Sequence, residues 1–115
     1  MPELSPTQVT LQLLELARQL QQLSDELDGV ERAAVEAKEV YTVAYAKTFL
    51  DQSGPVEERK QRTVWLTRQE RLDAELADVS VRAHRRKIAT LGTRIDIGRS
   101  AAALVRAEAE LVRAR

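Results

Sequence analysis

The segment TFLDQSGPVEER, residues 48–59, contains the clearest interruption in an otherwise helix-forming sequence. Gly54 and Pro55 are turn residues, and the residue before a proline is disfavoured in the α-helical region. Pro55 also suits the first position of a new helix, and Glu57 and Glu58 are favourable in its first turn. The segment therefore predicts a turn at 51–55 between two helices.

The residues before this turn carry a heptad pattern. Apolar or small residues recur from Val9 to Ala44 with spacings that alternate between four and three, which is typical of a helix in a coiled coil. Ser5, Pro6 and Gln8 fit a capping box at its start. We therefore expect a helix over about 6–50. The residues of its packing face are Val9, Leu13, Leu16, Leu20, Leu23, Leu27, Val30, Ala34, Ala37, Tyr41 and Ala44.

The residues after the turn contain no further proline, so the second helix is expected to span about 56–113, with LGT at 91–93 as its weakest point. A second heptad pattern predicts its packing face, and an additional apolar row lies beyond one edge of that face. The packing face consists of Val81, His84, Ile88, Leu91, Ile95, Gly98, Ala102, Val105, Ala109 and Val112, and the additional row of Ile97, Leu104 and Leu111.

These patterns predict an all-α fold, with two long helices in a hairpin that forms one domain over residues 1–115. Because a single partner helix cannot cover both apolar rows, we expect a closed, coiled-coil-like homo-oligomer. The spacing counts no subunits and does not separate a hairpin from helices swapped between protomers. The expected interface residues are Leu13, Leu16, Leu20, Leu23, Leu27, Ile88, Leu91, Ile95, Ile97, Leu104, Val105 and Leu111.

The composition limits the class of protein. The 115 residues include no cysteine, which excludes disulfides and thiolate metal sites. No apolar run approaches the roughly 20 residues of a membrane span, and residues 1–10 lack the pattern of a signal peptide. We therefore expect a cytoplasmic protein without a membrane partner, in the host cell cytoplasm if a phage encodes it.

Charge is distributed unevenly in this chain of zero net charge. Residues 1–54 carry a net charge of −5 and residues 55–115 a net charge of +5, and VRAHRRKIATLGTRIDIGRS (81–100) has six basic residues and one acidic residue. Arginines that recur along one helix edge are suited to the phosphates of a nucleic acid. The candidate nucleic-acid-binding residues are Lys47, Arg59, Lys60, Arg82, Arg85, Arg86, Lys87, Arg94, Arg99 and Arg106.

A structural role for these basic residues is the alternative. Arginines beside a heptad face often pair with acids of the next helix, and their long stems also cover apolar surface. The aromatic residues Tyr41, Tyr45, Phe49 and Trp65 lie near the turn, where they favour packing over the stacking of bases. The acids available for pairing on the first helix are Asp25, Glu26, Asp28, Glu31, Glu36 and Glu39.

Catalysis has little support in the sequence. The single histidine, His84, has no Cys, Asp or Glu three or four residues away, so it predicts a core or register-fixing residue instead of a metal ligand. Asp96 is most simply a counter-charge for arginines. Because a phosphate-binding glycine loop, a nucleophile elbow and a carboxylate pair are all absent, we expect no enzyme, no metal and no cofactor.

The order of three segments resembles the UvsY-type recombination mediator proteins of bacteriophages. These segments are YAKTFLDQSG, VEERKQRTVWL and RIDIGRSAAALVRAE, and the resemblance covers roughly residues 36–108. It implies a small helical oligomer that binds single-stranded DNA and helps to load a RecA-like recombinase onto strands occupied by single-strand-binding protein. Lys47 matches the first residue of the family's basic pair before the turn, and Phe49 stands where the second would be.

A coiled-coil scaffolding or assembly protein of a phage, without nucleic-acid binding, is the competing interpretation. It requires the arginines to form salt bridges with the first helix, whereas a nucleic-acid-binding protein leaves them open to solvent. Helical-hairpin secretion partners of the W-x-G type are a third class, but the turn here is DQSGP and Trp65 is followed by Leu66 and Thr67.

Overall fold

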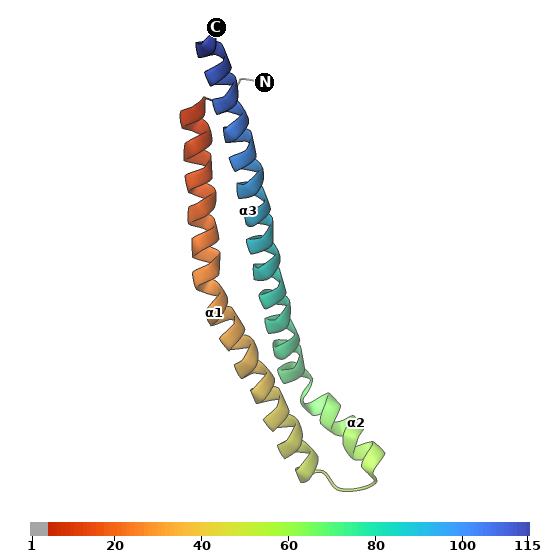
Figure 1. The fold of residues 1–115 in the computed structure, drawn as a ribbon. Coiled ribbons are helices and arrows are strands. Elements are labelled where there is room, and N and C mark those ends of the chain that lie inside the picture. Colours follow the sequence, from red (N-terminus) through yellow and green to blue (C-terminus); the bar gives the residue numbers. More distant parts are fainter. Residues whose placement is uncertain (1–4) are drawn as a thin grey trace. The chain divides into compact units, whose positions relative to one another are not determined.

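The computed structural model describes residues 5–115, which form an all-α hairpin (Figure 1). Helix α1 spans Pro6–Asp51, α2 spans Val56–Leu66 and α3 spans Arg68–Ala114. The long helices α1 and α3 have 46 and 47 residues, so each is about 70 Å long at the rise of an α-helix. The predicted pair of long helices is confirmed, and the short α2 connects them.

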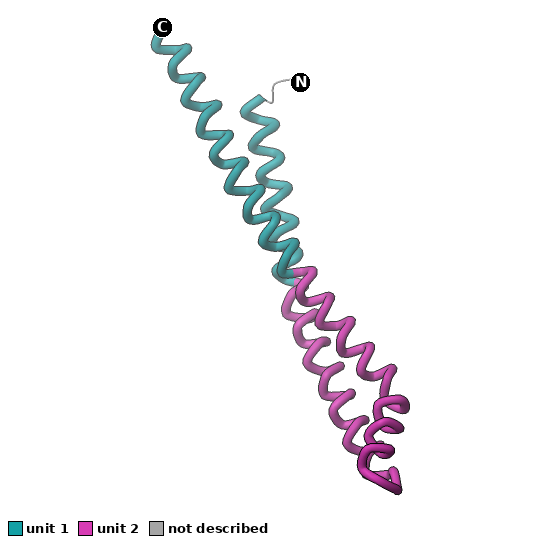
Figure 2. Tube along the Cα trace, turned by 90° about the vertical axis from the view of Figure 1, so that its right-hand side faces the viewer, with its two compact units in different colours: residues 1–25, 85–115 teal, residues 26–84 magenta. Residues whose placement is uncertain are grey.

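The hairpin divides into two compact units (Figure 2). Unit 1 combines residues 5–25 of α1 with residues 85–115 of α3, and unit 2 comprises residues 26–84. Within each unit the segments of α1 and α3 run side by side in opposite directions. No helix within residues 5–115 is long and apolar enough to cross a membrane.

One contact in each unit fixes how the two helices face one another. In unit 1, Gly98 of α3 lies against Leu13 of α1, and a Cβ atom added to Gly98 would be 2.6 Å from Leu13 Cδ2. In unit 2, His84 Nε2 lies 3.3 Å from Glu26 Oε2. The two residue numbers sum to 111 for the pair in unit 1 and to 110 for the pair in unit 2. A nearly constant sum is what two antiparallel helices in regular alignment give.

The predicted packing faces are confirmed. Every predicted residue from Val9 to Ala44 on α1 is buried or half-buried, and on α3 only Val112 of the predicted face is exposed. The buried hydrophobic side chains are Val9, Ala34, Val81, Leu91 and Ile95. Leu16 and Leu20, which are also expected at an interface between subunits, are half-buried within the chain itself, and their place in an interface stays a prediction.

The packing face after the turn begins earlier than the sequence indicates. The spacing of four and three continues upstream from Val81 through Ala77, Ala74, Glu70, Thr67 and Thr63, and none of these residues is exposed. Thr63 and Thr67 are the most buried, with 0% and 2% of their surface accessible. Because these side chains are small or polar, apolar periodicity does not reveal them.

The expected single helix over 56–113 is interrupted at Thr67, whereas LGT at 91–93 is continuous helix. Thr67 has φ −107° and ψ 14°, away from the helical values near −63° and −42°. The hydroxyl of Thr67 donates to Thr63 O at 2.7 Å, and that of Thr63 donates to Arg59 O at 2.7 Å. Such bonds to the preceding turn bend helices, and they replace the glycine or proline that sequence rules associate with a break.

Backbone and side-chain hydrogen bonds hold the helix ends. Ser5 and Gln8 form the predicted capping box, with distances of 2.9 Å and 3.2 Å. At the turn, Arg59 Nη2 donates to Phe49 O at 3.3 Å and Arg62 Nη2 donates to Ser53 O at 2.6 Å. Arg59 thus bonds a carbonyl group in the last turn of α1, and Arg62 bonds a carbonyl group of the turn that follows it.

Candidate nucleic-acid interface

Arginines line one edge of the α3 packing face. Arg85, Arg99 and Arg106 each follow a residue of that face, and Arg113 continues the same position. We call these four residues the arginine row. Because residues seven apart lie on the same side of an α-helix, the row forms one line along α3. All four residues are exposed.

The two central members of the row have no partner within the described chain. Arg99 and Arg106 form no hydrogen bond or ion pair with another described residue, whereas Arg85 does interact within the chain. The acids that were candidates for pairing have other partners in several cases. Glu26 contacts His84, Asp28 pairs with Arg32 at 3.3 Å, and Asp25 accepts from Gln21 at 2.8 Å.

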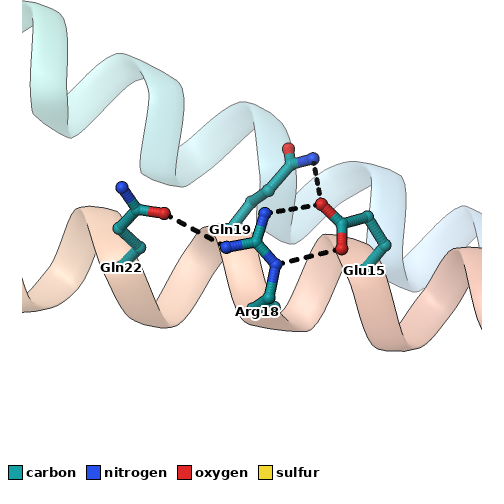
Figure 3. A network of polar contacts seen from close by, with 4 residues as sticks. All are labelled: Glu15, Arg18, Gln19 and Gln22. Carbon is teal, nitrogen blue, oxygen red and sulfur yellow. Dashed lines mark hydrogen bonds and ion pairs between the residues drawn. The ribbon is translucent and has the colours of Figure 1, made fainter.

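Glu15, an acidic residue of α1 in unit 1, is also paired within its own helix (Figure 3). Glu15 accepts from Arg18 Nε at 3.0 Å, from Arg18 Nη2 at 2.7 Å and from Gln19 at 3.1 Å. The hydrogen bonds from Arg18 lower the pKa of Glu15 from 4.5 to about 2 and raise the pKa of Arg18. Arg18 therefore compensates this carboxylate, and the charges of Arg99 and Arg106 stay uncompensated.

Arg99 and Arg106 flank an apolar hollow in unit 1. The hollow has a volume of about 210 Å³ and lies between the start of α1 and the last turns of α3. Apolar and small side chains form most of its wall, with the two guanidinium-bearing residues at its side. The remaining lining residues are Pro6, Val9, Thr10, Leu13, Ala102 and Val105.

The other candidate nucleic-acid-binding residues of α3 divide between two edges. Arg82 and Arg86 lie further out on the side of the arginine row, whereas Lys87 and Arg94 each precede a residue of the packing face and so lie on its opposite edge. All four are exposed and form no hydrogen bond or ion pair with another described residue. A nucleic-acid strand in contact with the arginine row would therefore not also contact Lys87 and Arg94.

The basic residues near the turn have different surroundings. Lys47 is exposed and forms no ion pair with a described residue, and Lys60 lies 3.6 Å from Glu57 in an exposed ion pair. Arg59 is half-buried, and its guanidinium lies 4.4 Å above the Phe49 ring. Arg59 thus supports the turn. Basic side chains near a helix C-terminus can bond its last carbonyl groups, but the sequence does not show that Arg59 returns to the helix end at Phe49, ten residues earlier.

The aromatic residues mostly pack, with one exception. Tyr45 stacks on Phe49 with ring centroids 6.4 Å apart, and Tyr41 meets Tyr45 edge-on at 6.2 Å. Trp65 differs from the packing interpretation because 64% of its surface is exposed, and the Arg68 guanidinium covers its ring at 4.0 Å. Because Tyr45 and Phe49 stack on each other and Arg59 covers Phe49, these two rings pack beside the turn.

His84 has the surroundings of a register-fixing residue. Its Nδ1 lies 3.0 Å from Ser80 O on the preceding turn, and its Nε2 contacts Glu26 of the facing helix. No group of three His, Cys, Asp or Glu side chains in the described part of the chain is arranged to hold a metal ion. A polar contact across a packing face favours one alignment of two helices over shifted ones.

Comparisons of the chain with protein-family models, with curated proteins and with solved structures find no match. The relation to UvsY-type mediators thus stays a prediction.

Proposed function

We propose that this protein is a non-enzymatic, homo-oligomeric single-stranded-DNA-binding protein, and that the arginine row contacts the phosphates. The observation that carries the proposal is the state of Arg99 and Arg106, which are exposed and have no partner among the described residues. Salt bridges to the first helix, which a scaffolding role requires of them, are not formed by these two residues.

The charge of the surrounding segment supports an anionic partner. Residues 85–115 contain eight basic and three acidic residues, and the acid of α1 closest in sequence to the hollow, Glu15, is compensated by Arg18. Guanidinium groups in a line release counterions from a nucleic acid when they contact its phosphates. Each chain offers few such contacts, so several chains in one oligomer would supply the affinity.

The hollow beside Arg99 and Arg106 favours a single strand over a duplex. An unstacked base can occupy an apolar site while neighbouring guanidinium groups contact its phosphates, and a duplex keeps its bases stacked inside. The hollow has an apolar wall that includes Val9, Leu13 and Val105. This arrangement makes no contacts that distinguish one base from another, so weak sequence preference is expected.

The role in recombination rests on the resemblance to UvsY-type mediators. In that role the bound strand is organised so that a RecA-like recombinase nucleates on DNA occupied by single-strand-binding protein. The exposed Lys47 is compatible with the family's contact before the turn. Phe49 packs against Tyr45 and Arg59, so in this chain the arginine row is proposed to replace the second basic residue of that contact.

The experiment is fluorescence anisotropy of a labelled single-stranded oligonucleotide titrated with the protein at about 50 and about 200 mM salt. We expect binding that weakens steeply with salt and that is much weaker, but still measurable at the lower salt concentration, in an Arg99→Glu/Arg106→Glu variant of unchanged helix content. A Lys38→Glu/Arg71→Glu variant is the matched control, because it changes the charge equally at two exposed residues outside the row.

A coiled-coil assembly protein without nucleic-acid binding is the second candidate. The observation in its favour is the row of Ile97, Leu104 and Leu111, which are between 65% and 68% exposed. Absence of oligonucleotide binding at about 50 mM salt, in a protein that still self-associates, would replace the proposed function by this one.

A further inference from the structure

A second stripe of residues runs along α3 in unit 1, beside the face that packs on α1 and on the edge opposite the arginine row. The spacings of its members alternate between three and four, as in a helix-packing seam. Every member is exposed. We call this set the outer stripe, and its members are Arg94, Ile97, Ala101, Leu104, Glu108 and Leu111.

The outer stripe has the apolar content of a contact surface. Ile97, Leu104 and Leu111 are 65%, 68% and 67% exposed, although large apolar side chains in such a regular row are normally covered. The side of α3 that meets α1 is occupied by the residues of the packing face, including Leu91, Ile95 and Gly98. The stripe is therefore available to a helix from another chain.

The order of residues in the stripe is complementary to itself. Read from the N-terminal end, its first five members are basic, apolar, small, apolar and acidic, with Ala101 in the middle, and Leu111 follows them. Arg94 lies seven residues before Ala101 and Glu108 lies seven residues after it. Neither charged side chain forms a hydrogen bond or ion pair with a described residue.

We propose that a second copy of this chain docks antiparallel on the outer stripe, with the two-fold axis at Ala101. In this pairing Ile97 of each copy packs near Leu104 of the other, and Arg94 of each copy meets Glu108 of the other. The small Ala101 allows the two helices to approach closely at the axis. A two-fold contact of this kind uses the same surface on both subunits and closes on itself.

Charge selects the antiparallel arrangement over the parallel one. A parallel, in-register pair would place Arg94 beside Arg94 and Glu108 beside Glu108, and like charges that face one another across a helix pair disfavour that pair. The antiparallel pair replaces both repulsions by two opposite-charge contacts. The apolar residues supply most of the affinity, and the charges decide the orientation.

The contact gives the homo-oligomer of the proposed function a defined surface, but it does not depend on nucleic acid. None of its residues belongs to the arginine row. The experiments that test this pairing use the protein without oligonucleotide. A failure of the pairing can therefore be distinguished from a failure of DNA binding.

Light scattering after size exclusion tests the pairing. We expect the wild type to have a mass of an even number of 12.9 kDa chains, the smallest being two. Arg94→Glu and Glu108→Arg should each have half of the wild-type mass. The double variant Arg94→Glu/Glu108→Arg regains the wild-type mass. An equal mixture of the two single variants also associates, because both contacts are then attractive in the mixed pair. A monomeric wild type, or single variants of unchanged mass, would overturn the proposal.

Cysteine cross-linking tests the axis independently, because the chain contains no cysteine of its own. Oxidation of Ala101→Cys should give a covalent dimer, whereas Ile97→Cys should cross-link only when mixed with Leu104→Cys. Circular dichroism confirms that each variant is helical before it is oxidised. Cross-linking of Ile97→Cys with itself, equal to that of Ala101→Cys, would show a parallel pair and contradict the proposal.

Discussion

Arginine residues have two different roles in this chain, and their neighbours decide which. Arg59 and Arg62 follow the turn, where a carbonyl group in the last turn of α1 and one in the turn itself accept their hydrogen bonds. Arg99 and Arg106 lie in the middle and later part of α3, where the helix satisfies its own carbonyls and no acid is in contact with them. The same side chain is therefore a structural element at one place and a free charge at another.

The turn arginine is expected to contribute to stability. Replacing Arg62 by alanine removes a 2.6 Å hydrogen bond to Ser53 O, and a hydrogen bond from a charged group contributes about 1.5–3 kcal/mol, less where solvent is close. We expect Arg62→Ala to lower the unfolding temperature. Arg71→Ala, at an exposed residue without such a bond, serves as the control and should change it little. Equal effects of both variants would show that the bond does not stabilise the turn.

The Glu15 carboxyl is expected to titrate at low pH. Hydrogen bonds from Arg18 and Gln19 lower its pKa from 4.5 to about 2. Because the folded-state pKa is below the unfolded one, the pair's contribution to stability is present above the unfolded pKa and is lost as the pH falls toward the folded one. NMR of the side-chain carboxyl carbon should therefore give a midpoint below 4.5 that returns toward it in Arg18→Gln.

Gln22→Ala is the control for this titration, since Gln22 contacts Arg18 and not Glu15. It should leave the midpoint of Glu15 low. A wild-type pKa of Glu15 at its ordinary value of 4.5, or no change in Arg18→Gln, would contradict the assignment of the shift to Arg18.

The sequence identifies the arginine row but not the roles of Arg59 and Lys60. The heptad position of Arg85, Arg99 and Arg106 follows from their spacing alone, because a helix fixes which residues share an edge. The contact of Arg59 with Phe49 depends on where the chain returns after the turn, and no local pattern contains that information. The pairing of Asp28 with Arg32 is different, because residues four apart on one helix are neighbours and the sequence spacing alone indicates it.

At the scale of helices, apolar spacing is a strong predictor where the packing residues are large and a weak one where they are small. The faces from Val9 to Ala44 and from Val81 to Ala109 are confirmed residue by residue. The five positions before Val81 are occupied by Thr63, Thr67, Glu70, Ala74 and Ala77, so the pattern there is visible only in the structure. The break at Thr67 depends on side-chain hydrogen bonds, which composition does not encode.

Two glycines of α3 are expected to respond differently to substitution. A Cβ atom at Gly92 meets nothing within 4 Å, whereas one at Gly98 would lie 2.6 Å from Leu13 Cδ2. Alanine is favoured over glycine in a helix interior by about 1 kcal/mol. Gly92→Ala should therefore raise the unfolding temperature, by roughly 4 °C for a chain of this length.

Gly98→Ala should give little or none of this gain, because Leu13 must move from its position in the packing face. Thermal unfolding followed by circular dichroism compares the two variants. An equal rise for both would show that Leu13 adapts without cost and that Gly98 is not needed for the approach of α1 and α3.

At the scale of the whole molecule, charge is divided unevenly between the two units. The described residues of unit 1 carry nine basic and five acidic residues, and those of unit 2 carry nine basic and twelve acidic residues. The zero net charge of the chain thus combines a positive unit with a negative one. Unit 1 contains both the arginine row and the outer stripe, so a site for phosphates and a surface for a second copy lie on one element.

The salt dependence of single-stranded DNA binding tests the central claim most directly. For a single strand, the slope of log K against log salt is about −0.7 for each phosphate contact. The account predicts that Arg99→Glu/Arg106→Glu makes this slope shallower by about 1.4 per bound chain, whereas Lys38→Glu/Arg71→Glu leaves it unchanged. An identical slope in the wild type and in Arg99→Glu/Arg106→Glu would mean that the arginine row does not contact phosphate, and would contradict the account.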